Sequence, residues 1–185
     1  MTLPDSVAGD ERLRLFLALR LPEPVLDVLA EWQGAHLSHD GVRVVPRAHL
    51  HLTLAFLGHR PAGELESIVA ALRDAAARAE EIRLTPARYR ETRSVGMLVL
   101  EDEGGRATVL ADDVQEQLEQ LGVYRHEGRA WLPHLTVARW RERPRLQPEP
   151  PPRRTFVPSD AAAYLSRLHP GGARYEVLES VALGG

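Results

Sequence analysis

Two histidines, each followed two residues later by a threonine, are the residues of this sequence best suited to chemistry. Residues 51–54 (HLTL) return as residues 134–137 (HLTV), 83 positions further along the chain. Successive side chains of an extended strand point to opposite faces, so each histidine should share a face with its threonine, and the apolar residues should share the other. Each motif therefore offers an apolar side to a core and an imidazole with a hydroxyl to whatever lies opposite.

A pair of such motifs suits a reaction that needs two proton transfers. Imidazole titrates near neutrality, so one histidine can accept a proton while the other donates one. A threonine hydroxyl is a neutral donor that can hold an anionic oxygen beside the imidazole. A single His-x-Thr is more often structural, but two copies in strand-like alternation favour catalysis. Facing each other, the motifs would hold a phosphate between two acid/base groups without requiring a metal.

A metal site is the first alternative, because His49 shares the predicted strand face of His51 and His-x-His can bind a metal. A third ligand is difficult to find nearby. Glu64 and His59 both lie beyond the turn that we expect at Gly58. We therefore expect no metal and no cofactor at the site.

The composition excludes several other kinds of chemistry. The chain has no cysteine and all 23 of its basic residues are arginine, which excludes thiol nucleophiles, Walker-type phosphate loops and lysyl-nucleotide intermediates. A net charge of −3 argues against a nonspecific duplex binder. No apolar run approaches the roughly 18 residues of a membrane span, and the acidic start of the chain is unlike a signal peptide. We expect a cytoplasmic protein that does not associate with membranes.

The hydrophobic pattern predicts an α+β fold, in which antiparallel strands are separated by helices without regular βαβ alternation. A tail at 1–10 should precede it, and segment 139–152, basic and rich in proline, is a candidate flap over an anion. Inward residues of the third helix should be Leu110, Val114, Leu118 and Leu121. The predicted strands are 12–20, 42–45, 49–57, 82–91, 95–100, 130–140, 161–168 and 174–183; the predicted helices run from Pro22 to His36, from Pro61 to Glu80 and from Gly105 to Gly122.

The motifs together resemble those of the two-histidine (2H) phosphoesterase superfamily, and within it the branch called RNA 2′,3′-cyclic phosphodiesterase or 2′-5′ RNA ligase. The resemblance spans nearly the whole chain and is carried by the segments RLFLALRLP, HLHLTLAFLG, WLPHLTVAR and YLSRLHPGGARYEVLES. It implies that residues 11–185 form one bilobal domain with pseudo-twofold symmetry, whose antiparallel sheets line a central cleft with helices outside. Val44 stands where many members carry tryptophan, a difference at the rim of the site.

The resemblance also implies roles for individual residues. His51 corresponds to the proton donor to the departing 3′ oxygen, and His134 to the base that activates water. Thr53 and Thr136 correspond to the residues that hold the nonbridging phosphate oxygens. Arg139 matches an arginine that often ends the second motif, although strict alternation would point it away from His134 unless the strand bulges.

Two further residues are candidates for substrate binding. Phe56 could stack on a base, although its parity with Leu52 and Leu54 favours core packing instead. Ser166 matches a family position near the site and could equally be structural.

The activity implied by the resemblance is the opening of an RNA 2′,3′-cyclic phosphate to a 2′-phosphate, with tRNA halves as possible substrates and ATP-independent 2′-5′ joining as the reverse reaction. We expect a monomer. The alternative from another class is a protein that binds RNA ends or nucleotides with little catalysis.

Overall fold

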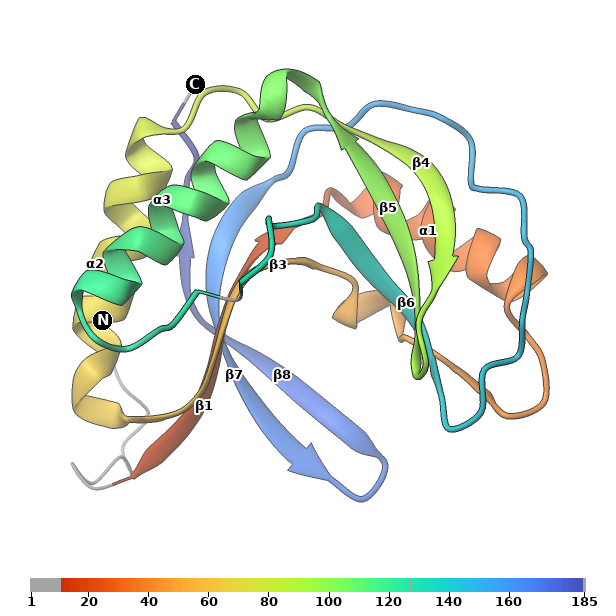
Figure 1. The fold of residues 1–185 in the computed structure, drawn as a ribbon, viewed down its shortest axis with the longest axis horizontal. Helices are drawn as coiled ribbons and strands as arrows, with labels where there is room; N and C mark the ends of the chain where they lie inside the picture. The colour runs from red at the N-terminus through yellow and green to blue at the C-terminus, as the bar shows by residue number, and fades with distance from the viewer. Residues whose placement is uncertain (1–10, 127, 185) are drawn as a thin grey trace.

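The computed structural model describes residues 11–126 and 128–184, so the predicted tail at 1–10 lies outside the described residues. Two four-stranded antiparallel sheets form the two lobes of an α+β fold (Figure 1). The first sheet has the order β3 (Leu52–Pro61), β1 (Arg12–Arg20), β7 (Asp160–His169), β8 (Gly172–Val181). The second has the order β2 (Val42–Val44), β6 (His134–Trp140), β5 (Val95–Asp102), β4 (Leu84–Glu91). The two motifs therefore lie in different sheets.

Three α-helices cover these sheets on the outside. Helices α2 (Leu65–Arg78) and α3 (Arg106–Gln120) pack together on the first sheet, while α1 (Glu23–His36) lies beside the second (Figure 1). Short 3-10 turns occupy Arg47–His49, Ala62–Glu64 and Glu103–Gly105. The strands β3 and β6 contact each other although they belong to different sheets, which brings the two motif strands together at the centre of the molecule.

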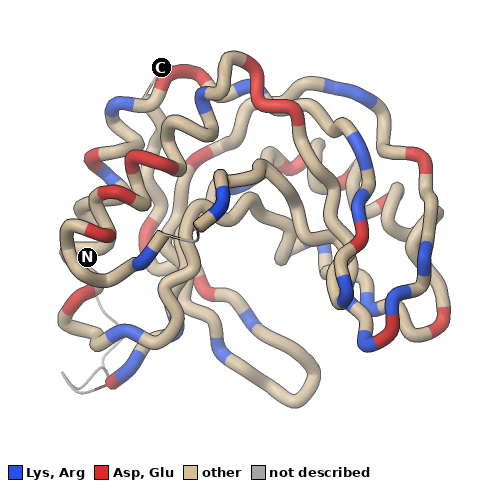
Figure 2. Tube along the Cα trace, in the orientation of Figure 1, with Lys and Arg blue, Asp and Glu red and all other residues tan. Residues whose placement is uncertain are grey.

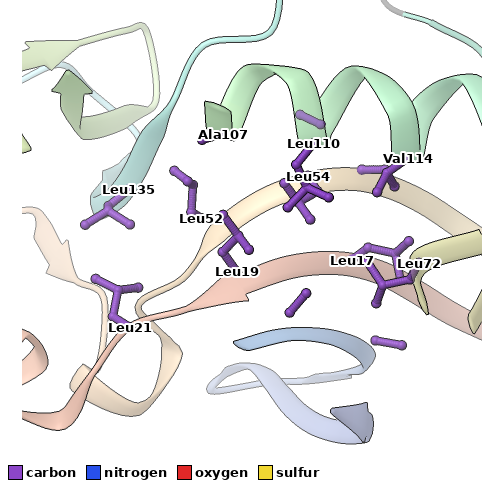
Figure 3. Packing of buried hydrophobic residues seen from close by; sticks show 14 of the residues in the cluster. Leu17, Leu19, Leu21, Leu52, Leu54, Leu72, Ala107, Leu110, Val114 and Leu135 are labelled. Carbon is purple, nitrogen blue, oxygen red and sulfur yellow. The ribbon is translucent and has the colours of Figure 1, made fainter. Parts of the chain in front are cut away.

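The core lies between the first sheet and its helices and continues into the second sheet. Alternate leucines of β1 are buried because they share the face toward α2 and α3. Figure 3 shows this packing, in which apolar side chains of β1, β3, α2, α3 and β6 meet: Leu17, Leu19, Leu52, Leu54, Leu72, Leu110, Val114 and Leu135. The apolar faces of both motif strands are thus fixed in one core.

The predicted order of strands and helices is confirmed, whereas several boundaries and orientations are wrong. The first motif strand begins at Leu52 and runs through Gly58, which adopts a φ of +65° within the strand instead of ending it. Helical spacing predicts that His36 continues the packed face of α1 and is half-buried, but it is exposed. Leu121 is 45% exposed because α3 ends at Gln120 and Gly122, with a φ of +71°, turns the chain away.

Candidate active site

A cleft of about 940 Å³ lies between the two sheets, and both motif strands contribute to its lining. Strands β1, β2, β3, β6, β7 and β8 all supply side chains. The lining includes His51 and Thr53 of the first motif and Thr136 of the second. It also includes the three other predicted substrate-binding residues, Phe56, Arg139 and Ser166. His134 is not among the lining residues, although it lies two residues before Thr136 on β6.

The same backbone hydrogen bond orients both histidines. Nδ1 of His51 lies 2.8 Å from the carbonyl oxygen of His49, and Nδ1 of His134 lies 2.8 Å from that of Leu132. A carbonyl can only accept, so in each ring Nδ1 carries a proton and Nε2 is the nitrogen that can exchange one. The two imidazoles are therefore held in the same tautomer by equivalent contacts, each two residues back along the chain.

Aromatic rings surround His51 on the side of the first sheet. The His51 ring centroid is 4.8 Å from that of Phe16 and 5.5 Å from that of Tyr175, and Tyr164 stacks on Phe16. Tyr175 also lies 4.6 Å from the ring of His49, which lines the same cleft. This apolar wall removes water from most of the imidazole, while the ring keeps some exposure to the cleft.

Burial lowers the pKa of His51 to about 4. The hydrogen bond to the His49 carbonyl opposes this shift, and the nearby charges of His49, Arg139 and His134 reinforce it. His51 is therefore neutral at pH 7 in the free protein. An anion in the cleft would favour its protonated form, because a nearby negative charge raises the pKa of an imidazole.

Each motif strand contains a bulge directly after its threonine. On β3, Thr53 pairs with Ala18 while Ala55 pairs with Leu17, which leaves Leu54 as the extra residue. On β6, the register of the pairs with β5 shifts at the equivalent place, and Val137 is the extra residue. A bulge reverses the alternation of the residues that follow it, on β3 as far as a second register shift at Leu57.

These bulges determine where Phe56 and Arg139 point. Each is the fifth residue after its motif histidine, and strict alternation would direct both away from the site. With the bulges, both line the cleft, and Phe56 is 48% exposed. The expectation of core packing for Phe56 was therefore wrong, because the parity argument assumed regular strands. Arg139 was expected to point toward the site only if its strand contained a bulge, and β6 contains one.

Two buried glutamines hold the bulges from behind. Gln115 of α3 donates from Nε2 to the carbonyl oxygen of Leu54 at 2.7 Å. Gln33 of α1 donates from Nε2 to the carbonyl oxygens of Val137 and Val45 at 2.8 and 3.0 Å. Both side chains are almost fully buried, at 4% and 1% exposed. Sequence reasoning missed them; the available signal was a polar residue on the buried face of each helix.

Arg14 is a second residue that sequence reasoning missed. Its Nη1 donates to Oγ of Ser166 at 2.6 Å, and its guanidinium lies 4.7 Å above the ring centre of Phe56. Ser166 is buried and accepts this bond at the edge of the cleft. The alternation of β1, which places Arg14 and Phe16 on the face opposite the leucines, could have indicated this position.

The predicted flap runs elsewhere. Of segment 139–152, only Arg139 lines the cleft. The carboxylate of Glu91 at the end of β4 accepts hydrogen bonds from the Arg143 side chain and from the backbone N–H groups of Arg145 and Leu146. Further along, the indole of Trp32 donates to the carbonyl of Glu149. The segment is thus fastened to β4 and α1.

Among residues 11–126 and 128–184, no three His, Cys, Asp or Glu side chains are grouped so that they could hold a metal ion. No helix of the same residues is both long and apolar enough to cross a bilayer.

Two antiparallel sheets, each with a His-x-Thr strand beside one cleft, define the class of two-histidine phosphoesterases. The chain belongs to the family of LigT-like phosphoesterases, whose model matches residues 19–91. RNA 2′,3′-cyclic phosphodiesterase of Thermus thermophilus is 36% identical over 184 residues, covering 94% of this chain and 91% of that protein. The Escherichia coli protein of the same name is 27% identical, covering 94% and 98%. The crystal structure of TT0787 from Thermus thermophilus superposes with a TM-score of 0.82 at 32% identity, covering 94% and 99% of the two chains.

Proposed function

We propose that this protein hydrolyses the 2′,3′-cyclic phosphate at the end of an RNA and leaves a 2′-phosphate. The observation that carries the proposal is the pair of equivalent histidines, each with Nδ1 bonded to a backbone carbonyl, Nε2 left for proton transfer and a threonine two residues further along the chain. The names of the relatives describe this activity, and the family is shared.

In the proposed reaction, Nε2 of His134 accepts a proton from water as the water oxygen attacks phosphorus. The bond between phosphorus and O3′ breaks, and Nε2 of His51 donates its proton to the departing oxygen. The hydroxyls of Thr53 and Thr136 donate to the nonbridging oxygens, and the Arg139 guanidinium adds positive charge. His51 is neutral in the free protein, so its proton is taken up with the anionic substrate, and exchange with solvent restores both rings.

The test is hydrolysis of an RNA oligonucleotide that ends in a 2′,3′-cyclic phosphate, with the phosphate isomer of the product identified. We expect a 2′-phosphate, no loss of activity with chelator, and a decrease in turnover of roughly two to four orders of magnitude in His51→Ala and in His134→Ala. His39→Ala is the matched control, because His39 is exposed in a loop outside the cleft. Full activity in either motif variant, with a normal circular dichroism spectrum, would refute the proposal.

The same assay separates the other possibilities. Tight binding of the cyclic phosphate with no product would indicate an RNA-end binder, and loss of activity on chelation would indicate a metal site at His49 and His51. Adding an RNA with a free 5′-hydroxyl shows whether the site also joins ends through a 2′-5′ bond, because the 5′-hydroxyl would take the place of water in the same attack, with His134 accepting its proton and His51 protonating the departing O3′.

We further propose that the protein acts as a cytoplasmic monomer, with tRNA halves among its substrates. One chain supplies residues of both motifs to the cleft and brings β3 against β6, so the site does not need a second copy. Sedimentation of the purified protein tests the oligomeric state. Incubation with tRNA halves that carry a cyclic phosphate tests the substrate.

A further inference from the structure

The cleft carries more positive charge than a cyclic phosphate needs. Four arginines line it, Arg14, Arg43, Arg139 and Arg174, and no described lining residue is aspartate or glutamate. The chain as a whole has a net charge of −3, so this concentration of cations is local. In Figure 2 many acidic positions lie on the outer helices α2 and α3, away from the cleft. A cyclic phosphate diester has one negative charge, which leaves cationic groups for a further anion.

Arg43 and Arg139 form a like-charged pair within the second sheet. They are direct cross-strand partners on β2 and β6, and both line the cleft. Like charges directly opposite each other destabilise a sheet. Neither arginine has a carboxylate partner in the described part of the chain, whereas Arg20 and Arg47, for example, form ion pairs there. An anion bound between the two strands would relieve this repulsion.

The two arginines lie at different places relative to the reaction. Arg139 follows the second motif and is close enough to His51 for its charge to act on that ring. Arg43 lies on the neighbouring strand β2, roughly 4.8 Å from Arg139. Arg139 can therefore act on the reacting phosphate, whereas the charge of Arg43 has no comparable effect on His51.

The hairpin of β7 and β8 reaches Arg43 from the opposite sheet. Its turn, from Leu168 to Arg174, lines the cleft, and the hairpin extends away from the helices (Figure 1). Nη1 of Arg43 lies 3.8 Å from the position that a Cβ on Gly172 would occupy. Arg174 follows on β8, also without a carboxylate partner among the described residues. Arg43 and Arg174 therefore line the cleft from different sheets, Arg43 from β2 and Arg174 from β8.

We propose that Arg43 and Arg174 bind the phosphodiester that links the terminal nucleotide of the RNA to the nucleotide before it. This inference rests on the proposed function and specifies its substrate class: RNA ends of two or more nucleotides, rather than cyclic mononucleotides. Arginine suits this role because its planar guanidinium can donate two hydrogen bonds to one phosphate. The reacting phosphate thus contacts Arg139, and the phosphate before it contacts Arg43 and Arg174.

The experiment compares kcat/KM for a nucleoside 2′,3′-cyclic phosphate with that for a dinucleotide ending in the same cyclic nucleotide. We expect the dinucleotide to be preferred by roughly tenfold or more, as for a charge-assisted contact. A dinucleotide whose linkage is an uncharged methylphosphonate should lose most of this preference, which separates the phosphate from the added base. Higher salt should reduce the preference, because phosphate contacts release counterions.

Arg43→Gln and Arg174→Gln should each reduce the preference for the dinucleotide severalfold, with a smaller effect, within about threefold, on the mononucleotide. Arg154→Gln removes the same charge from an exposed arginine outside the cleft and should retain the preference. The proposal is overturned if the mononucleotide and the dinucleotide react equally, or if both arginine variants keep the full preference. In those cases hydrolysis that depends on His134 would leave the proposed function intact. If neither substrate reacts, the proposed function fails and this inference fails with it.

Discussion

Replacing the buried glutamines behind the bulges should reduce both stability and activity. Gln33→Leu and Gln115→Leu keep the side-chain volume similar and remove the amide. In Gln115→Leu the carbonyl of Leu54 loses its side-chain donor; in Gln33→Leu the carbonyls of Val45 and Val137 lose theirs. The carbonyl of Val137 keeps a bond from the Val45 N–H at 3.0 Å, so only part of the cost applies there.

The magnitudes follow from these contacts. An unsatisfied buried acceptor costs about 1–3 kcal/mol, so we expect about 2 kcal/mol for Gln33→Leu and about 1–2 kcal/mol for Gln115→Leu. For a chain of 185 residues, each 1 kcal/mol lowers Tm by about 2–4 °C. If the bulge at Val137 relaxes, Arg139 turns away from the cleft, and the loss of its charged contact with phosphate should reduce kcat/KM by roughly tenfold or more.

Two measurements test this prediction together. The first is thermal unfolding monitored by circular dichroism, and the second is steady-state hydrolysis of a cyclic-phosphate substrate. Gln120→Leu is the control, because Gln120 is an exposed glutamine at the end of α3, and it should change neither quantity. Assays are made well below the Tm of each variant, so that partial unfolding does not lower the rate. If both variants lose stability but keep the wild-type kcat/KM, the glutamines stabilise the fold without positioning the site, and the reasoning is wrong.

Four further predictions concern three residues, His51, Phe56 and Glu91. The His51 ring should titrate near pH 4 in the free protein, since burial lowers its pKa, and inorganic phosphate should move this titration upward; a value of 6 or more by histidine NMR would contradict the buried environment. Between pH 6.5 and 4 His51 binds a proton in the unfolded chain but not in the folded protein, so this group should lower the free energy of unfolding as the pH falls, by up to about 3 kcal/mol. The stability of His51→Asn, measured by denaturant titration, should therefore depend less on acid pH than that of the wild type. Phe56→Leu should raise KM roughly tenfold or more with little change in Tm, because the exposed ring is available for stacking and contributes little to the core; an unchanged KM would exclude base stacking. Glu91→Gln should lower Tm by several degrees and leave kcat/KM near the wild-type value, because Glu91 fastens segment 139–152 away from the cleft; a loss of activity without a loss of stability would instead support the flap.

The sequence alone was sufficient for the order of the elements and for the two motifs. Leucine alternation in β1 and the helical spacing in α2 and α3 are local patterns, and one face of each element must be buried whatever its partner. Likewise, His51 lies two residues before Thr53, directly ahead of β3, and His134 lies two residues before Thr136 on β6. An extended local geometry is sufficient for each histidine to share a face with its threonine. The pairing of the two motifs across 83 residues was inferred from their repetition, and the contact between β3 and β6 agrees with it.

Only the tertiary structure decided the orientation of Phe56 and Arg139. A bulge is fixed by the register against a neighbouring strand, β1 for β3 and β5 for β6, and by a glutamine that arrives from a distant helix. No local pattern in HLTLAF or HLTVAR specifies that extra residue, and one extra residue reverses the faces of the side chains that follow it, Phe56 and Arg139 included. The contact between Arg14 and Ser166, 152 residues apart, and the course of segment 139–152 depend in the same way on partners that come together only when the chain folds.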